Sequence, residues 1–421
     1  MKPASVSNPA EAALAEIVGR DHVLAALADS IGGPHPRFVV EPGTERELSS
    51  ALRLTNDANL AVIPRGGGTK NDWGNPPARA DLILSTARLN KIIEHAWADL
   101  TLTVEAGCTV ATLQAALAQH GQRLALDPLW PGKATVGGVL STNDSGALRL
   151  RFGALRDLII GVTLALPDGT LASSGGKVVK NVAGYDLPKL ATGALGTLGV
   201  ITRAVFRLHP LPRNSSTFSI STRNCEHAQG LLLSLQDSKL AHTALQARIA
   251  GDSQPIIDIL FEGTEAGIAA QGAQARKMAE PAAFVESPAA VWDARQKLWD
   301  DSDSVAIAKL SILPAQFART SELVQRASEA HQAGWQCVVQ ATGIGWLRLE
   351  GASQDLHAAL LELRAQFERD GGSLVVFHRP SAMPPMDAWG QPGDALPLMR
   401  AVKHQFDPKN TLNPGRFVGG I

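Results

Sequence analysis

The chain has 421 residues, of which 45% are hydrophobic, and its 39 basic and 40 acidic residues give a net charge of -1. A hydrophobic fraction of this size supports a large buried core and excludes an intrinsically disordered protein. The balanced charge excludes an overall basic surface, so no nucleic-acid partner is expected. The longest apolar run, Leu158–Leu166, is far shorter than the ~20 residues of a transmembrane helix, and no membrane span is predicted.

Cysteine and histidine usage gives no sign of a disulfide framework or a metal centre. The three cysteines, Cys108, Cys225 and Cys337, are odd in number and widely spaced, unlike the dense, paired cysteines of disulfide-stapled domains. The eleven histidines are scattered, and none lies in an H-x-H, H-x-x-H or H-E-x-x-H pattern, so no metal site is predicted. Charged residues interrupt the N-terminus, which argues against a secretory signal, and we expect a cytoplasmic protein with reduced thiols.

The first part of the chain alternates between predicted helices and strands. Residues 1–30 are rich in alanine and predict an N-terminal helical segment. A strand, a helix and a strand follow over residues 38–64, where Thr44 with Glu47 three residues later predicts a capping box at the helix start. The same order recurs over residues 100–126. Alternation of this kind is typical of α/β domains.

The chain changes character in its middle and divides into further segments. Residues 132–199 are dense in glycine, with short apolar strands and a predicted Pro-Asp-Gly hairpin turn at 167–169. Prolines then break the pattern, so we place one domain over residues 31–212 and a second, α+β domain over residues 213–380. Residues 381–421 are predicted to form a separate C-terminal segment.

The sharpest local motif is Pro-Arg-Gly-Gly-Gly-Thr at residues 64–69, directly after a predicted strand. Three successive glycines leave the backbone free to adopt positive φ, so several N–H groups can point toward one centre and bind a diphosphate. A flexible turn at the strand end is the alternative interpretation. No helix begins after these glycines, and no Gly-Lys pair is followed by Ser or Thr. A Rossmann fingerprint and a P-loop are therefore both excluded.

Two further clusters of small and polar residues follow. Pro131–Gly138 and Ser141–Gly146 would allow close approach of a flat ligand and offer it hydrogen bonds, although a glycine-rich interdomain loop is an equally good interpretation. Gly175–Leu187 contains two lysines and Tyr185, the only tyrosine of the chain. An anion-facing role is one interpretation of this cluster; solvated lysines and a core tyrosine with a bonded hydroxyl are the other.

Taken together and in this order, the motifs resemble the FAD-binding domain of the vanillyl-alcohol-oxidase (PCMH) type. The resemblance rests on PRGGGT, ATVGGVLSTNDSG, RFGALRDLIIGVTLALPDG and KNVAGYDLPKLATGALGTLGVIT, and DPKNTLNPGRF is similar to the C-terminal signature of FAD-linked 2-hydroxyacid dehydrogenases. It implies an α+β fold with an FAD-binding domain in two α/β subdomains and a smaller α+β cap domain with an antiparallel sheet. The C-terminal segment is implied to fold back on the FAD domain.

The resemblance also implies which residues bind FAD. The loop from Arg65 to Lys70 would wrap the diphosphate through its backbone N–H groups, and Gly196–Ile201 would offer backbone groups to the adenine side. The implied set is Arg65, Gly66, Gly67, Gly68, Thr69, Lys70, Pro131, Gly132, Thr135, Gly137, Gly138, Thr142, Asn143, Gly146, Lys180, Asn181, Tyr185, Gly196, Gly199, Val200, Ile201 and Asn413.

Two departures from the family pattern bear on the chemistry. Members with covalent flavin carry histidine where this chain has Thr69, so we expect FAD to bind non-covalently. The H-x-H…G-D-G-N motif of catalytic 2-hydroxyacid dehydrogenases corresponds to Ala341–Leu347, which contains no histidine or acid. We therefore expect no catalytic metal, and the catalytic residues stay unassigned.

The resemblance implies the FAD-binding subunit of a glycolate oxidase complex, which takes part in the oxidation of glycolate, a 2-hydroxy acid, to glyoxylate. Its implied partners are a homologous catalytic FAD subunit and an iron–sulfur subunit that receives the electrons, since this chain has no clustered cysteines. Any membrane association would arise through these partners. One alternative is a self-sufficient FAD-dependent 2-hydroxyacid dehydrogenase, in which Arg379 or Lys180 grips the substrate carboxylate. A non-catalytic scaffold subunit, whose FAD site only organises partners, is the other.

Overall fold

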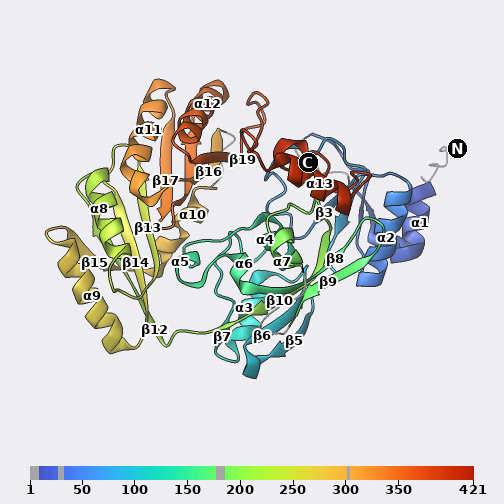
Figure 1. Ribbon diagram of the computed structural model, residues 1–421, viewed down its shortest axis with the longest axis horizontal. Coiled ribbons are helices and arrows are strands. Elements are labelled where there is room, and N and C mark those ends of the chain that lie inside the picture. The colour runs from blue at the N-terminus through green and yellow to red at the C-terminus, as the bar shows by residue number, and fades with distance from the viewer. Residues whose placement is uncertain (1–8, 27–32, 177–184, 301–303) are drawn as a thin grey trace. The chain divides into compact units, whose positions relative to one another are not determined.

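The computed structural model describes residues 9–26, 33–176, 185–300 and 304–421, which form two compact units (Figure 1). Unit 1 takes in residues 1–144, 154–210 and 391–421, and unit 2 takes in residues 145–153 and 211–390. Both units combine helices with antiparallel strands. The predicted α+β class is therefore confirmed.

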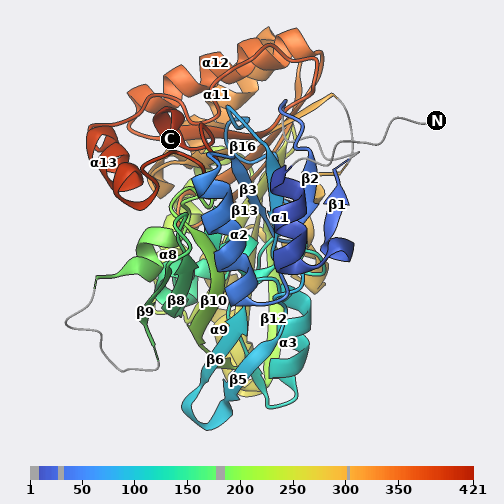
Figure 2. The same ribbon diagram turned by 90° about the vertical axis from the view of Figure 1, so that its right-hand side faces the viewer.

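The first sheet of unit 1 is short and mostly parallel. Its order is β1-β2-β4-β3, with β2, β4 and β3 parallel to one another and β1 antiparallel to β2. Helices α1 and α2 lie side by side (Figure 2) and bury Leu14, Leu48 and Leu52 in one core with Leu82 of the sheet. The elements are α1 (Pro9–Val18), β1 (Val23–Ala25), β2 (Phe38–Val40), α2 (Glu45–Asp57), β3 (Val62–Arg65) and β4 (Leu82–Ser85).

The N-terminal segment is less helical than predicted. Gly19, with φ of 89°, ends α1, because a left-handed residue cannot continue a right-handed helix. A short 3₁₀ helix follows at Arg20–His22, and Val23–Ala25 then pairs with β2, so the prediction of a helical segment over residues 1–30 is wrong at residues 23–25. Residues 1–8 and 27–30 lie outside the described residues. Helix α2 begins where predicted, with Thr44 Oγ1 accepting from Glu47 N at 3.1 Å. The second bond of a capping box would run from Thr44 N to the Glu47 side chain. Here Glu47 Oε2 accepts instead from Gly43 N, one residue earlier.

The second sheet of unit 1 is antiparallel throughout, in the order β5-β6-β10-β8-β9. The strand predicted near residue 123 is reduced to the two-residue β7, which pairs with β11. Short turns join β5 to β6 and β8 to β9, which only antiparallel pairs allow, so this subdomain is α+β rather than α/β. The elements are β5 (Ile92–Ala96), β6 (Thr101–Glu105), α3 (Val110–Ala118), β7 (Gln122–Arg123), α4 (Val136–Thr142), α6 (Leu155–Leu158), β8 (Ile159–Ala165), β9 (Leu171–Gly175), α7 (Leu187–Ala191), β10 (Val200–Arg207), β11 (His209–Pro210) and α13 (Leu396–Phe406).

Unit 2 is built on one antiparallel sheet in the order β15-β12-β14-β13-β17-β18-β16-β19. Helices α8, α9, α11 and α12 share one core with alternate strand residues such as Ile259 and Leu347, so they cover one face of the sheet. No helix in the described part of the chain is long and apolar enough to cross a membrane. The elements are α5 (Arg149–Phe152), β12 (Asn214–Ser221), α8 (Cys225–Gln236), β13 (His242–Ala250), β14 (Ile256–Gly263), α9 (Glu265–Ala279), β15 (Ala283–Ser287), α10 (Ala294–Lys297), β16 (Val305–Ser311), α11 (Phe317–Ala330), β17 (Gly334–Gln340), β18 (Ile344–Glu350), α12 (Ser353–Arg369) and β19 (Ser373–His378).

The unit boundaries differ from the predicted domains in two places. Residues 145–153 fall inside the predicted first domain but belong to unit 2, where α5 packs on β13. The return to unit 1 comes at Gln391 rather than at residue 381. The reason is that Ala388 O accepts hydrogen bonds from Val376 N at 2.8 Å and from Arg364 Nη2 at 3.0 Å, which hold the intervening segment in unit 2.

A buried ion pair fixes the C-terminal segment within unit 1. Lys403 Nζ lies 2.7 Å from Asp407 Oδ2 and also donates to Thr197 O at 2.8 Å and Leu412 O at 2.9 Å. Asp407 Oδ1 accepts from Thr411 N at 3.0 Å. Burial lowers the pKa of Lys403, while the adjacent Asp407 carboxylate raises it. The C-terminal segment therefore depends on this pair for its position.

We predict that Lys403→Met lowers the free energy of unfolding by about 3 kcal/mol, because it leaves the buried Asp407 carboxylate without its cation. Urea denaturation followed by circular dichroism measures the change. Lys409→Met is the matched control, since Lys409 is exposed in the same segment, and it should change stability by about 0.5 kcal/mol or less. Equal stability of the two variants would contradict the structural role of the pair.

Candidate cofactor-binding site

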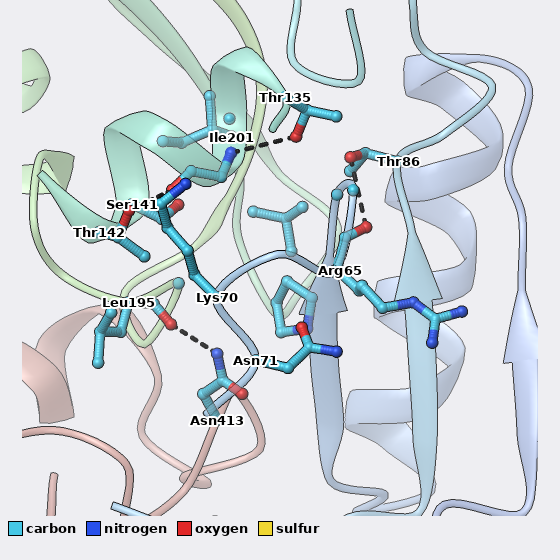
Figure 3. Close-up of a pocket in the computed structure, with 18 of the residues that line it drawn as sticks. Arg65, Lys70, Asn71, Thr86, Thr135, Ser141, Thr142, Leu195, Ile201 and Asn413 are labelled. Carbon is cyan, nitrogen blue, oxygen red and sulfur yellow. Dashed lines mark hydrogen bonds between the residues drawn. The ribbon is translucent and has the colours of Figure 1, made fainter. Parts of the chain in front are cut away.

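A pocket of unit 1 brings together segments that lie far apart in the sequence (Figure 3). One wall is the loop that follows β3, and a second is helix α4. The third wall consists of the loop before β10 and the first residues of β10. Two residues of the C-terminal segment complete it. The lining residues are Pro64, Arg65, Gly66, Gly67, Gly68, Thr69, Lys70, Asn71, Thr86, Thr135, Gly137, Gly138, Ser141, Thr142, Leu195, Gly196, Gly199, Val200, Ile201, Asn413 and Arg416.

The glycine loop after β3 touches the segment before α4 so closely that no side chain fits. A Cβ atom at Gly67 would lie 1.8 Å from Lys133 O, and one at Gly66 would lie 2.0 Å from Thr135 Oγ1. Gly68 has φ of 72°, a conformation that side chains disfavour. The loop therefore presents main chain to the pocket, as the sequence motif predicts for a diphosphate-binding nest.

Helix α4 is held against the second sheet by backbone hydrogen bonds. Val136 N donates to Cys108 O at 2.9 Å and Gly137 N to Ala106 O at 2.8 Å, just beyond the end of β6. Thr142 Oγ1 donates to Gly138 O at 2.8 Å within the helix. This wall therefore carries hydroxyl groups on a fixed scaffold.

The third wall is attached to α4 and to the C-terminal segment. Leu195 N donates to Ser141 O at 2.8 Å, and Leu195 itself has φ of 50°. Asn413 Nδ2 donates to Leu195 O at 2.5 Å, as the dashed line in Figure 3 shows. The loop before β10 is thereby fixed from both sides.

The charges at the pocket favour an anionic ligand. Among the described lining residues Arg65, Lys70 and Arg416 are cationic, and none carries a carboxylate. Lys70 Nζ is buried 3.2 Å from Asp144 Oδ2 and lies over the rings of Trp73 and Trp130, so its charge serves the fold. Lys70 would therefore contact a ligand through its backbone N–H group rather than through its side chain.

Arg416 is a residue that the sequence interpretation missed. Its guanidinium is buried and donates to Asn71 O and, at 2.7 Å, to Trp73 O, immediately after the glycine loop. Burial lowers the pKa of Arg416 to about 10, while Asp72 acts in the opposite direction. An anion in the pocket would stabilise the charged form. Arg416 lies within the NPGRF motif, and this was the one feature of the sequence that could have pointed to it.

Most of the residues predicted to bind FAD line this pocket. Those predicted residues that do not line it are Pro131, Gly132, Asn143, Gly146 and Tyr185; Gly146 belongs to unit 2. Tyr185 is 90% exposed, so its interpretation as a core residue is wrong. Lys180 and Asn181 lie outside the described residues. The lining residues that the prediction omitted are Pro64, Asn71, Thr86, Ser141, Leu195 and Arg416.

Comparison with known proteins identifies the cofactor. Residues 36–175, which include the glycine loop and α4, match the family model described as an FAD binding domain. The cofactor of this chain is FAD. The match ends before the third wall and the C-terminal residues of the pocket.

The chain is similar over most of its length to two dehydrogenases of known name. It is 27% identical to D-2-hydroxyglutarate dehydrogenase of Xanthomonas citri pv. viticola (91% of this chain, 89% of the relative) and 28% identical to D-lactate dehydrogenase of Archaeoglobus fulgidus (90% and 91%). It is 31% identical to glycolate oxidase subunit GlcD of Bacillus subtilis, over 50% of this chain and 45% of that relative.

A solved structure confirms the predicted PCMH-type fold. The crystal structure of p-cresol methylhydroxylase with substrate bound aligns with a TM-score of 0.79 over 97% of this chain and 96% of that chain. The sequence identity of the two is 15%, so this likeness concerns the fold alone.

The pocket can be tested as the FAD site with two glycine variants. We expect Gly67→Ala to abolish FAD binding, because the added Cβ would lie 1.8 Å from Lys133 O and force the loop away from its neighbour. Gly132→Ala is the control, since a Cβ there meets no atom within 4 Å and the position lies outside the lining. The measurement is the FAD-to-protein ratio after purification. A Gly67→Ala variant that keeps full FAD content while folded would contradict the site.

We also predict that the FAD is held non-covalently. No histidine, cysteine or tyrosine is among the described lining residues, so the pocket presents no ring nitrogen, thiol or phenol to form a covalent link. Acid precipitation should release all flavin into the supernatant, as its absorption spectrum would show. Yellow colour retained in the protein pellet would contradict this prediction.

Proposed function

We propose that FAD binds in this pocket and that the chain is the FAD-binding subunit of a glycolate oxidase complex. The complex would oxidise glycolate to glyoxylate and pass the electrons to an iron–sulfur subunit. When bound, FAD supplies the acceptor for the two electrons that leave the alcohol carbon. The residues of this chain would hold the cofactor through the glycine loop, α4 and the segment 195–201.

The substrate class is supported by the names of the relatives. Lactate, 2-hydroxyglutarate and glycolate all carry a hydroxyl on the carbon next to a carboxylate, and dehydrogenases or oxidases of these acids are similar to this chain. A 2-hydroxy acid is therefore the substrate class that we propose. Glycolate is the member we favour, because the order of the sequence motifs and the NPGRF ending resemble the FAD-binding subunit of glycolate oxidase.

Dependence on a partner is supported by the stretch Ala341–Leu347, which comprises the turn after β17 and the first half of β18 and carries no acid or base. The next cation, Arg348, is buried and donates to Leu298 O at 3.0 Å and Asp300 O at 2.8 Å. No group of three or more metal-ligating side chains occurs among the described residues. Alcohol oxidation needs a proton acceptor, so its absence from this stretch is the observation that carries the proposal.

A self-sufficient 2-hydroxyacid dehydrogenase is the second candidate. Two relatives favour it: both are named as dehydrogenases rather than as subunits, and each aligns with this chain over about nine-tenths of both sequences. The candidate for the substrate carboxylate is Arg379, but its Nη1 already donates to Met386 O at 2.6 Å. This arginine therefore has a structural bond in addition to any contact with substrate.

Anaerobic flavin reduction distinguishes the candidates. We expect glycolate to bleach the flavin of the isolated chain at least about 100-fold more slowly than in the complex purified from the native cell, since a missing general base costs roughly that much. D-lactate and D-2-hydroxyglutarate are tested in parallel. Stopped-flow absorbance gives the rates, and metal analysis accompanies both samples.

Three other outcomes would change the assignment. Rapid bleaching of the isolated chain, or one tightly bound metal ion per chain, would favour the self-sufficient enzyme. Bleaching by another 2-hydroxy acid but not by glycolate would keep the reaction and change the substrate. Flavin that stays oxidised even in the complex would indicate the scaffold subunit.

A further inference from the structure

Helix α13 of the C-terminal segment, labelled in Figure 2, exposes its apolar side chains and buries a charged one. Of its eleven residues, all of which the structure describes, only Lys403 is buried. Leu398 is 68% and Met399 39% exposed, and Val402 and Phe406 are only partly buried. A surface helix normally turns its apolar stripe toward the core. The apolar residues of α13 therefore contribute little to the fold of unit 1.

Polar bonds on one side hold the helix in place. Lys403 Nζ bonds to Asp407 and to Leu412 O at 2.9 Å, and Arg400 Nη2 donates to Gly419 O at 2.9 Å. At 3.6 residues per turn, Lys403 lies about 140° around the helix from Leu398. Attachment through Lys403 consequently leaves the side of the helix that carries Leu398 open.

The ionisable groups exposed beside the apolar residues are all basic. Arg400 and His404 lie on the helix, and Lys409 follows it. Residues 396–417, all of them described, contain a single acid, Asp407, which is buried against Lys403. Two copies of this surface would bring like charges together, which disfavours self-association. The surface instead fits a partner that offers apolar side chains together with Asp or Glu.

Helix α13 is also attached to one wall of the pocket. Lys403 Nζ donates to Thr197 O at 2.8 Å, and Thr197 lies between the lining residues Gly196 and Gly199. A protein docked on α13 would therefore lie beside this wall. The electron acceptor of a flavin subunit has to approach the cofactor, so proximity to the pocket favours the acceptor as the partner.

We propose that α13 docks the iron–sulfur subunit, which would cover Leu398, Met399 and Val402 with apolar side chains and place carboxylates beside Arg400 and His404. These five residues are the α13 surface. Insertion of an apolar helix face into a groove is a common mode of protein recognition. The proposal rests on the proposed function and adds to it the place at which the electron-accepting partner binds.

Leu398→Glu tests the α13 surface in the complex purified from the native cell. Glutamate is a good helix former, so α13 should persist, but its charge would enter an apolar contact. We expect the ratio of iron to FAD to fall at least about tenfold, with the FAD-to-protein ratio unchanged. Metal analysis gives the iron content, and mass spectrometry identifies the subunit that is lost.

Leu361→Glu is the matched control. Leu361 is an exposed leucine of α12 in unit 2, 46% accessible, so this variant introduces the same charge on a different helix. It should leave the iron-to-FAD ratio within about twofold of the unmodified complex. An equal loss of iron in both variants would overturn the proposal, because it would reflect added charge rather than a docking site.

Arg400→Glu and Arg400→Gln test the expected carboxylates of the partner. Both variants lose the guanidinium that donates to Gly419 O, so the difference between them reports the charge. We expect the iron-to-FAD ratio to be about fivefold lower for Arg400→Glu than for Arg400→Gln. Equal ratios would contradict an acidic partner.

Measurements on the isolated chain with and without Leu398→Glu identify any other occupant of the α13 surface. A lower melting temperature of the variant would show that the surface packs within the chain. Loss of a dimer in size-exclusion chromatography would assign it to a second copy. Loss of sedimentation with phosphatidylcholine–phosphatidylserine vesicles would assign it to a lipid surface. Each of these results overturns docking of the iron–sulfur subunit.

The unmodified complex separates this proposal from the proposed function. If the unmodified chain and Leu398→Glu both retain the iron–sulfur subunit, the proposed function stands and the α13 surface is refuted. If the unmodified chain purifies without an iron–sulfur subunit, the proposed function fails and this proposal fails with it.

Discussion

The contact between the glycine loop and the segment before α4 is the constraint on which the pocket depends. Gly66 and Gly67 approach Thr135 and Lys133 so closely that any Cβ atom would collide with them. Because the contact is made by main chain, the backbone N–H groups of the loop can face a ligand. The same contact aligns the ends of two different sheets. The glycine loop follows β3 of the first sheet, and α4 is bonded through Gly137 N to Ala106 O, just after β6 of the second sheet. The pocket is thus a product of packing between the two subdomains of unit 1.

Bringing such distant segments together costs conformational entropy, and buried polar groups help to offset it. The C-terminal segment is placed by Lys403, Asp407 and Arg416, which are buried and bonded mainly to backbone carbonyl and N–H groups. Burying these charges is costly unless every bond is made. A cofactor that binds only the folded state adds its own binding free energy to the fold. Cofactor binding and the position of the C-terminal segment are therefore expected to be coupled.

The sequence predicted those features that depend on local chemistry. The glycine run, the cap at Thr44 and the hairpin turn at residues 167–169 each require particular residues at fixed spacing, and each occurs where predicted. The sequence did not reveal the antiparallel order of the second sheet, because strand pairing is set by contacts between distant segments. For the same reason Arg416 was missed: the NPGRF motif contains it, but its burial beside residues 71–73 depends on contacts between distant segments.

The polar groups of the two units are used in different ways. In unit 2, Asp258 is fully buried and accepts hydrogen bonds from Arg248 at 2.5 and 3.0 Å, from Ser219 at 2.7 Å and from Gln246 at 3.0 Å. Arg348 is likewise bonded to carbonyl groups of its own unit. Side chains that satisfy one another stabilise a sheet but have little capacity left for a substrate. The pocket of unit 1, by contrast, offers backbone groups. Under the proposed function the chain supplies the cofactor site, and the base for the hydroxy acid comes from another subunit.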